Sequence, residues 1–363
     1  MEDNPLTSRV TRRRSLQLLA GTMVASAAPG LDAAAPLPAR RTGMGLVIYN
    51  CSIRRRWLQQ HQPGLDLFQP HVFLKHCHAQ GAGGMQAPLG VLPAAEVDAL
   101  RRFADEHDLY VEAIIGLPQN QLELERFESE IQTACDAGAK AARTTIIPGR
   151  RYERFKTLAE FREYERRGQR MLELAAPLVE KHRLPLAVEN HKDQRLDERI
   201  ALFEHLDSPF VGACLDTGNS FALLDGAHEP IAALAPYAFS VHLKDQALQE
   251  ASDGFMLGDI PLGQGSFDLP AMVAVIQRAK PQVRFTLELI TRDPLEVPCL
   301  SEDYFATLPD VPASDLARTI RFVRDHSAAQ LPAVDALPIE QQLALEDANV
   351  AASIKYAADV LGL

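Results

Sequence analysis

The 363-residue sequence predicts an α/β protein, a closed (β/α)8 barrel followed by a C-terminal helical extension. From residue 44 onward, short apolar runs alternate with longer amphipathic stretches, the pattern of buried parallel strands alternating with helices. Eight such units occupy about 250 residues, and the alternating region, 44–290, has this size. An open doubly wound sheet is the competing architecture, but the sequence has no G-x-G-x-x-G turn for a dinucleotide.

The first four predicted strands are short apolar runs. They comprise residues 45–49, 71–76, 109–116 and 139–147. A glycine-rich loop, 81–84, follows the second strand, and Pro148-Gly149 closes the fourth. The intervening helical stretches begin near Arg54 and continue at 93–107, 121–137 and 157–183, where apolar residues recur at helical spacing.

The last four predicted strands end at Glu189, Asp216, His242 and Glu288, and the helical stretches between them are 194–206, 228–235 and 268–280. The first two of these steps span 27 and 26 residues, one strand-helix-strand unit each, whereas the last spans 46. We therefore expect an inserted loop over the barrel mouth, marked by Gly254, Gly258, Gly263 and Gly265. Residues 291–363 add a proline-rich segment and two further helices, packed on the barrel or at a subunit contact.

Residues 1–42 are predicted to be a twin-arginine-like signal peptide and leader. Three arginines at 12–14 precede an apolar stretch, 18–28, which is too short to span a bilayer, and 25–27 form a small-x-small cleavage site. A disordered basic tail is the alternative. The signal predicts an exported or periplasmic protein, with the barrel at 43–327 and the helical extension at 328–363. No later run of 18 apolar residues exists, so no membrane association is expected after signal removal.

Composition and charge disfavour some classes of function. The net charge of −11 disfavours a nucleic-acid partner, whose phosphates require a basic surface. The five cysteines are widely spaced and form no C-x-x-C pair, which favours small buried hydrophobes over disulfides or a thiolate zinc site.

Four ligand-type side chains stand at the ends of the last four predicted strands: Glu189, Asp216, His242 and Glu288. Taken singly each is ambiguous, because a strand-end aspartate often caps a helix and a lone histidine is often structural. Together they would meet at the carboxyl end of the barrel, where active groups gather. Carboxylates with one imidazole suit a single Mn²⁺, Mg²⁺, Co²⁺ or Zn²⁺ ion. The sequence thus predicts a shared metal site.

Four motifs carry a family resemblance. They are Ala-Val-Glu189-Asn-His191, Cys-Leu-Asp216-Thr-Gly-Asn219, Val-His242-Leu-Lys244-Asp245 and Leu-Gly263-Gln-Gly-Ser-Phe-Asp268. In order and spacing they resemble the sugar phosphate isomerase/epimerase family, the xylose isomerase-like TIM barrels, over roughly residues 44–327. The resemblance implies that the four strand-end residues are metal ligands and that Glu189 and Glu288 also form an acid/base pair. The endonuclease branch has a histidine where this chain has Asn219, which argues against a three-zinc nuclease site.

Seven residues are candidates for substrate binding: His76, His78, Arg143, His191, Asn219, Lys244 and Arg292. His191 and Lys244 each follow a predicted ligand by two residues, and His76 and His78 end the predicted second strand. Solvated loop positions and loop capping are the alternatives. The two arginines could bind an anion or a sugar, or form surface ion pairs.

These features predict a divalent-metal-dependent isomerase or epimerase that acts on a keto-sugar or polyol through an enediolate. The alternative enzyme is a lyase or dehydratase that eliminates water or an aglycone from a 3-keto sugar or an inosose. A non-catalytic periplasmic carbohydrate-binding protein is less favoured, because binding alone needs no matched carboxylate pair. The expected partner is a small sugar or sugar derivative, and assembly into a homo-oligomer is left open.

Overall fold

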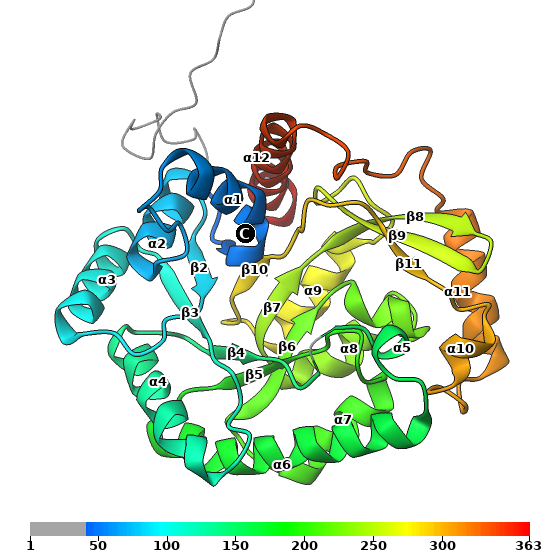
Figure 1. Cartoon of the computed structure of the whole chain (residues 1–363), viewed down its shortest axis with the longest axis horizontal. Coiled ribbons are helices and arrows are strands. Elements are labelled where there is room, and N and C mark those ends of the chain that lie inside the picture. Colours follow the sequence, from blue (N-terminus) through cyan, green and yellow to red (C-terminus); the bar gives the residue numbers. More distant parts are fainter. Residues whose placement is uncertain (1–40, 148) are drawn as a thin grey trace, which may run out of the picture. The chain divides into compact units, whose positions relative to one another are not determined.

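The computed structural model describes residues 41–147 and 149–363 (Figure 1). Eight strands, all paired in parallel, close into a barrel in the order β1-β10-β7-β6-β5-β4-β3-β2. The predicted (β/α)8 barrel is confirmed, and the doubly wound alternative is wrong. Residues 1–40 of the predicted signal and leader lie outside the described residues.

The barrel strands are short and almost entirely buried. They are β1 (Gly45–Val47), β2 (Gly84–Ala87), β3 (Tyr110–Ile114), β4 (Ala142–Thr144), β5 (Leu186–Glu189), β6 (Val211–Asp216), β7 (Ala238–Leu243) and β10 (Phe285–Leu287). Their burial explains the uniformly apolar runs of the sequence, since one side of each strand faces the barrel interior and the other faces a helix.

Amphipathic helices surround the strands (Figure 1). They are α2 (Pro70–Ala79), α3 (Ala94–Glu106), α4 (Leu124–Asp136), α6 (Leu158–His182), α7 (Leu196–Leu206), α8 (Glu229–Leu234) and α9 (Leu269–Ala279). Further helical segments are η1 (Ile48–Cys51), α1 (Ser52–His61), η2 (Gln121–Glu123), α5 (Arg151–Arg154), η3 (Asn219–Leu223), η4 (Ala235–Tyr237) and α10 (Glu302–Phe305).

The predicted strand at 71–76 is wrong, because these residues belong to α2. Pro70 starts this helix, where its fixed φ is favourable, and the buried Phe73, Leu74 and Cys77 share one helical face. The second strand is β2, at the end of the stretch predicted to be a glycine-rich loop. A Cβ on Gly84 would lie 2.5 Å from the backbone oxygen of Tyr110, so glycine here permits close strand approach rather than marking a flexible loop.

The predicted insertion after His242 is regular structure rather than an irregular loop. It is an antiparallel hairpin of β8 (Asp245–Ala251) and β9 (Gly254–Ile260), which continues from the carboxyl end of β7. With β11 (Leu295–Val297) the hairpin makes a three-stranded sheet beside the barrel (Figure 1). The Asp245 carboxylate anchors the following loop by accepting hydrogen bonds from the backbone N–H groups of Gly263 and Gly265, both at 2.9 Å.

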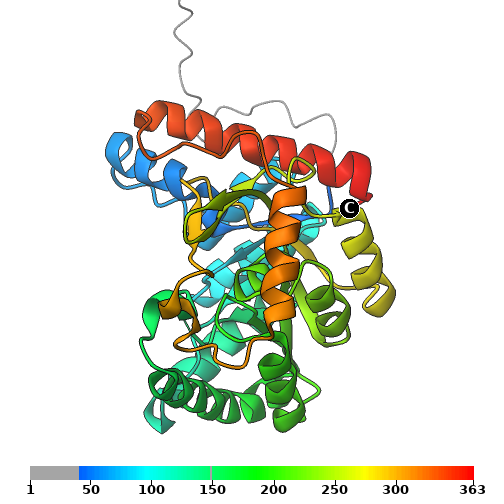
Figure 2. The ribbon, with the colours of Figure 1, turned by 90° about the vertical axis from the view of Figure 1, so that its right-hand side faces the viewer.

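The C-terminal helices are α11 (Ala313–Asp325) and α12 (Ile339–Tyr356), and α12 ends in a π-helical segment, Ala357–Leu361. α12 lies beside α1 in both ribbon views, and its π-helical end contacts α9 (Figures 1 and 2). The Thr42 hydroxyl donates to the carbonyl of Leu363 at 2.8 Å. The extension is therefore built into the helical layer around the barrel.

One carboxylate joins α12 to the start of α1. Glu346 is 2% exposed and accepts hydrogen bonds from the backbone N–H groups of Ile53 and Arg54, both at 2.8 Å. We expect Glu346→Ala to lower the free energy of unfolding by about 1–3 kcal/mol at pH 8, because two helix-start donors lose their acceptor. Urea denaturation measures this. Gln341→Ala, an exposed change on the same helix, is the control, and equal stability of the two variants would contradict the assignment.

The described residues contain no helix with the length and apolar character needed to cross a membrane. All five cysteines are free thiols, and Cys51, Cys77, Cys214 and Cys299 are buried, as expected for small hydrophobes.

Candidate metal centre

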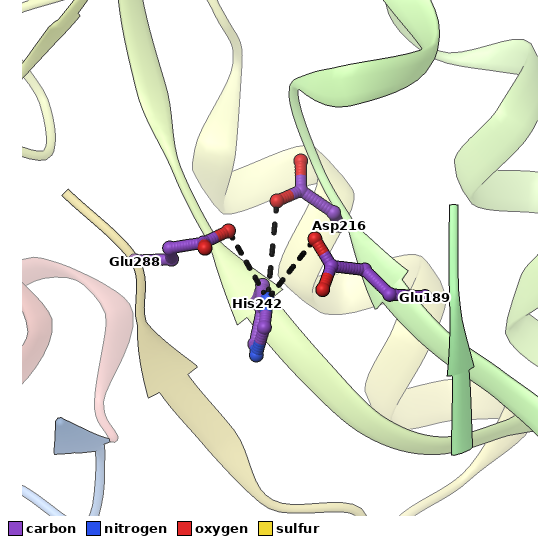
Figure 3. A group of neighbouring side chains, drawn as sticks. All are labelled: Glu189, Asp216, His242 and Glu288. Atoms are coloured by element: carbon purple, nitrogen blue, oxygen red, sulfur yellow. Dashed lines mark hydrogen bonds and ion pairs between the residues drawn. The ribbon is translucent and has the colours of Figure 1, made fainter. Parts of the chain in front are cut away.

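The four predicted ligands meet at one point (Figure 3). Glu189, Asp216, His242 and Glu288 each offer one ligand atom, and these atoms lie within 4.8 Å of one another. All four side chains are at most 3% exposed. The register explains their meeting, because Asp216 at the end of β6 pairs with His242 near the end of β7, while Glu288 directly follows β10.

The imidazole of His242 presents Nδ1 to the three carboxylates. Nδ1 lies 3.2 Å from Glu288 Oε2, 3.7 Å from Glu189 Oε1 and 4.0 Å from Asp216 Oδ2, as the dashed lines in Figure 3 show. The lone pair of a neutral imidazole at Nδ1 would therefore point into the cluster.

A buried hydrogen-bond chain behind His242 supports that tautomer. His242 Nε2 lies 2.7 Å from Gln86 Oε1, and Gln86 Nε2 donates to Glu112 Oε2 at 2.8 Å. Ser240 Oγ also donates to Glu112 Oε2, at 2.6 Å. Because the Gln86 oxygen can only accept, we assign the proton of neutral His242 to Nε2, which leaves Nδ1 available as a ligand.

Sequence analysis missed Gln86, Glu112 and Ser240. Each is completely buried within a mostly apolar barrel strand, and Ser240 shares β7 with His242. A single polar residue inside a buried strand is the signal that could have identified them, because such a group needs a hydrogen-bond partner.

The donor set fits a divalent cation. Asp216 Oδ2 is buried and accepts no hydrogen bond, although the Lys244 ammonium lies 3.2 Å away. Three carboxylates and one imidazole nitrogen suit Mg²⁺, Mn²⁺, Co²⁺ or Zn²⁺, and coordination would satisfy the unpartnered oxygen. The cluster therefore has the donors and the spacing to hold a divalent ion.

The cations around the cluster set the ionisation of its carboxylates. Burial alone would raise the pKa of Glu189, but the Arg143 guanidinium overcomes it and holds that pKa well below the usual range. Burial likewise opposes ionisation of Glu288, yet Lys244 and His242 lower its pKa well below the ordinary value. The pKa of Asp216 is instead raised to about 7, because burial outweighs the nearby Lys244 charge.

Three of the predicted substrate-binding residues lie at this cluster. Arg143 Nε donates to Glu189 Oε2 at 2.6 Å, so this arginine is a buried partner of a ligand and makes no surface ion pair. Asn219 Nδ2 donates to Glu189 Oε1 at 3.1 Å, and its backbone N–H donates to Asp216 Oδ1 at 2.7 Å. The Lys244 ammonium lies 3.1 Å from Glu288 Oε2.

Two other candidates lie on neighbouring loops. His191 is partly buried, its backbone N–H donates to Asp193 Oδ1 at 3.0 Å, and its Nδ1 has no hydrogen-bond partner. Arg292 is half-buried and pairs with Asp259 of the hairpin at 3.5 Å.

The structure does not bring His76 and His78 to the metal cluster. Both lie in the last turn of α2, which ends just before the amino end of β2, whereas the cluster is at the carboxyl ends of the strands. His78 stacks on His107 with ring centroids 4.2 Å apart, and burial lowers the pKa of His76 to about 3. The prediction that they bind substrate depended on a strand at 71–76, which would have ended at the carboxyl end of the barrel.

Sequence analysis also missed Lys192, which is 5% exposed and donates through Nζ to Asn219 Oδ1. Burial and the nearby Lys244 charge lower the pKa of Lys192 to about 8, so it remains mostly protonated at pH 7. Nothing in the polar run Asn190–Asp193 distinguishes this lysine from a solvated loop residue.

A large cavity lies elsewhere. It measures about 590 Å³ and opens at the amino ends of the strands, between Arg41, Lys140 and Arg284. The ligand-type side chains converge at the opposite end of the barrel, and we assign the chemistry to that end because size alone identifies no reaction.

The buried Glu112 predicts a pH effect on stability. Burial raises its pKa from 4.5 to about 7. As the pH rises, the unfolded state loses this proton at a lower pH than the folded state does. The stabilisation present below pH 4.5 is therefore lost as the pH rises to about 7, which lowers the free energy of unfolding by up to about 3 kcal/mol. In Glu112→Gln this part of the decline should be missing from urea-denaturation series. Exposed Glu96→Gln is the control, and parallel profiles for Glu112→Gln and the wild type would contradict the expectation.

Known proteins resemble this chain in both fold and sequence. The structures of L-ribulose 3-epimerase and of D-psicose 3-epimerase with D-fructose superpose with TM-scores of 0.52 and 0.53 at 14% and 13% identity. The first comparison covers 88% of this chain and 94% of the other, and the second covers 83% and 95%. The 3-keto-D-glucoside 4-epimerase of E. coli superposes with a TM-score of 0.50 at 14% identity, over 78% of this chain and 100% of that enzyme. These likenesses concern the fold.

A sequence relative is the 3-oxo-isoapionate decarboxylase of Pectobacterium atrosepticum. It is 32% identical over 109 residues, which are 30% of this chain and 40% of that protein. Residues 74–324, more than half of the chain, match the family described as the xylose isomerase-like TIM barrel. With the closed barrel and the cluster at its carboxyl end, this match gives the assignment. The chain belongs to the xylose isomerase-like TIM barrel family.

Proposed function

We propose that this protein is a divalent-metal-dependent isomerase or epimerase of a keto-sugar or polyol. The observation that carries the proposal is the pairing of Glu189 and Glu288, which approach His242 from two different strands within one buried cluster of ligand atoms. A cluster built only to bind a sugar needs no such pair of carboxylates. The epimerases with the same fold support the proposal.

The cluster supplies the groups that proton transfer needs. A divalent ion held there would acidify the C–H next to a carbonyl of the substrate and stabilise the negative charge that develops. Arg143 keeps Glu189 ionised and Lys244 keeps Glu288 ionised. Each carboxylate is thus in the state of a proton acceptor, so one can remove the proton. The other can return a proton to the opposite face once it has taken one up from water.

A lyase is the second candidate, and the decarboxylase relative favours it. Loss of CO₂ from a 3-oxo acid leaves the electron pair of the broken C–C bond next to the carbonyl, the same charge distribution that proton removal creates. Elimination of water or an aglycone from a 3-keto sugar or inosose would pass through this distribution as well. The same ionised cluster can serve either reaction.

The location of the protein belongs to the proposal too. We propose that the protein is exported through the signal predicted at 1–42, which would favour free sugars or glycoside breakdown products over phosphorylated intermediates. A fusion of residues 1–42 to a reporter that is active only after export tests this, and an inactive reporter would contradict it.

The reaction is tested by incubating Mn²⁺-loaded protein with keto-hexoses and 3-keto-glucosides in D₂O and following the sugars by NMR. We expect deuterium to appear at the carbon next to the carbonyl with no group lost. Release of CO₂, water or an aglycone would instead establish the lyase. A protein that binds Mn²⁺ but catalyses neither exchange nor release across this panel and 3-oxo sugar acids would contradict the enzyme proposal.

A further inference from the structure

Two buried ammonium groups share one acceptor beside the metal cluster. Lys192, in the loop after β5, and Lys244, between β7 and β8, both donate to Asn219 Oδ1, Lys244 at 3.3 Å. The two lysines are 5% and 3% exposed. Like charges held this close and out of water repel each other, which costs free energy unless an anion lies nearby.

The two lysines differ in their partners. Lys244 forms ion pairs with Asp216 at 3.2 Å and with Glu288 at 3.1 Å. Lys192 forms no ion pair within residues 41–147 and 149–363, and its ammonium is bound through the amide oxygen of Asn219. An amide oxygen carries no full charge, so Lys192 is a buried cation without a carboxylate partner in the part of the chain that the structure describes.

The summed charge of the cluster also indicates that an anion would be bound there. When His242 is neutral, as it must be to bind an ion through Nδ1, three carboxylates are balanced by three cationic side chains: Glu189, Asp216 and Glu288 by Arg143, Lys192 and Lys244. Arg292 and Asp259 cancel each other. A divalent ion would therefore leave a surplus of two positive charges, or of one if Glu112 behind His242 is counted as ionised. A neutral sugar would not offset that surplus.

We infer that Lys192 and Lys244, positioned by Asn219, bind a carboxylate of the substrate, which makes the substrate a keto-sugar acid rather than a neutral keto-sugar. This inference rests on the proposed function and names its substrate class. A carboxylate fits better than a phosphate. Both ammonium groups lie around the side-chain oxygen of Asn219, so they present a small, compact pair of donors. An arginine fork or a run of backbone N–H groups is typical of phosphate sites instead.

Calorimetry with matched ligands tests the inference. D-gluconate and D-glucitol have the same carbon chain but differ in charge, and D-glucitol 6-phosphate carries a phosphate instead. With Mn²⁺-loaded protein we expect gluconate to bind at least about tenfold more tightly than either other ligand. In Lys192→Gln the preference over glucitol should fall to about twofold. Lys140→Gln, an exposed lysine at the amino ends of the strands, should behave as wild type.

Three outcomes would overturn the inference. Equal affinity for gluconate and glucitol would show that the lysines recognise no carboxylate, and tightest binding of the phosphate would assign them to a phosphosugar. A gluconate preference that survives in a folded Lys192→Gln variant would mean that the carboxylate binds the ion itself. Titration of Mn²⁺ without sugar separates the two proposals. Failure to bind Mn²⁺ or another divalent ion removes the proposed function, whereas ion binding and turnover without a gluconate preference remove only this inference.

Discussion

Glu288→Gln is expected to lower turnover by about 10²–10⁴-fold, the range typical of removing a general acid or base. Glutamine keeps an oxygen for the ion but cannot take up a proton, so the variant should still fold and bind metal. The buried position of Glu288, 3.2 Å from His242 Nδ1 and 3.1 Å from the Lys244 ammonium, leaves little room for water to replace its carboxylate. Deuterium uptake from D₂O at the carbon next to the carbonyl measures the step directly.

Glu296→Gln is the matched control, since Glu296 is an exposed glutamate on β11. Calorimetric titration with Mn²⁺ should still detect ion binding in both variants, with wild-type affinity in Glu296→Gln and weaker affinity in Glu288→Gln, and turnover is compared at saturating Mn²⁺, which separates loss of the ion from loss of proton transfer. If Glu288→Gln binds Mn²⁺ and exchanges deuterium at the wild-type rate, Glu288 is a ligand only, and the acid/base pair proposed with Glu189 is wrong.

Adding Mn²⁺ at about 100 times its dissociation constant is expected to raise the free energy of unfolding by about 2.7 kcal/mol, because the ion binds the folded cluster and not the unfolded chain. The gain should be lost after dialysis against EDTA. It should also be absent in His242→Ala, which removes the nitrogen that faces all three carboxylates.

The readout is the change that the ion causes within each variant, because His242→Ala also breaks the buried hydrogen bond to Gln86 and lowers stability by itself. His71→Ala, at an exposed histidine on α2, should retain the full effect of the ion. If none of Mn²⁺, Mg²⁺, Co²⁺ and Zn²⁺ stabilises the wild type, the cluster is a buried charge network and not a metal centre.

The sequence predicts strands well where a long amphipathic helix lies next to them in the chain. The helix at 157–183 and the strand ending at Glu189 appear as α6 and β5, because a long amphipathic stretch and a short apolar run differ clearly in length. The apolar run 71–76 was too short for that distinction. It follows Pro70 and forms part of α2, and its misassignment moved two histidines to the wrong end of the barrel.

The sequence by itself determined the parallel barrel and the four side chains that meet at its carboxyl end. In a closed parallel sheet every strand ends at the same edge, so residues one unit apart in the chain must become neighbours in space. The tertiary structure alone decided what surrounds the ligands. The Glu112–Gln86–His242 chain joins three different strands, and Lys192 and Lys244 meet at the side chain of Asn219. Such contacts depend on side-chain directions and on the packing of segments far apart in sequence, which no local periodicity encodes.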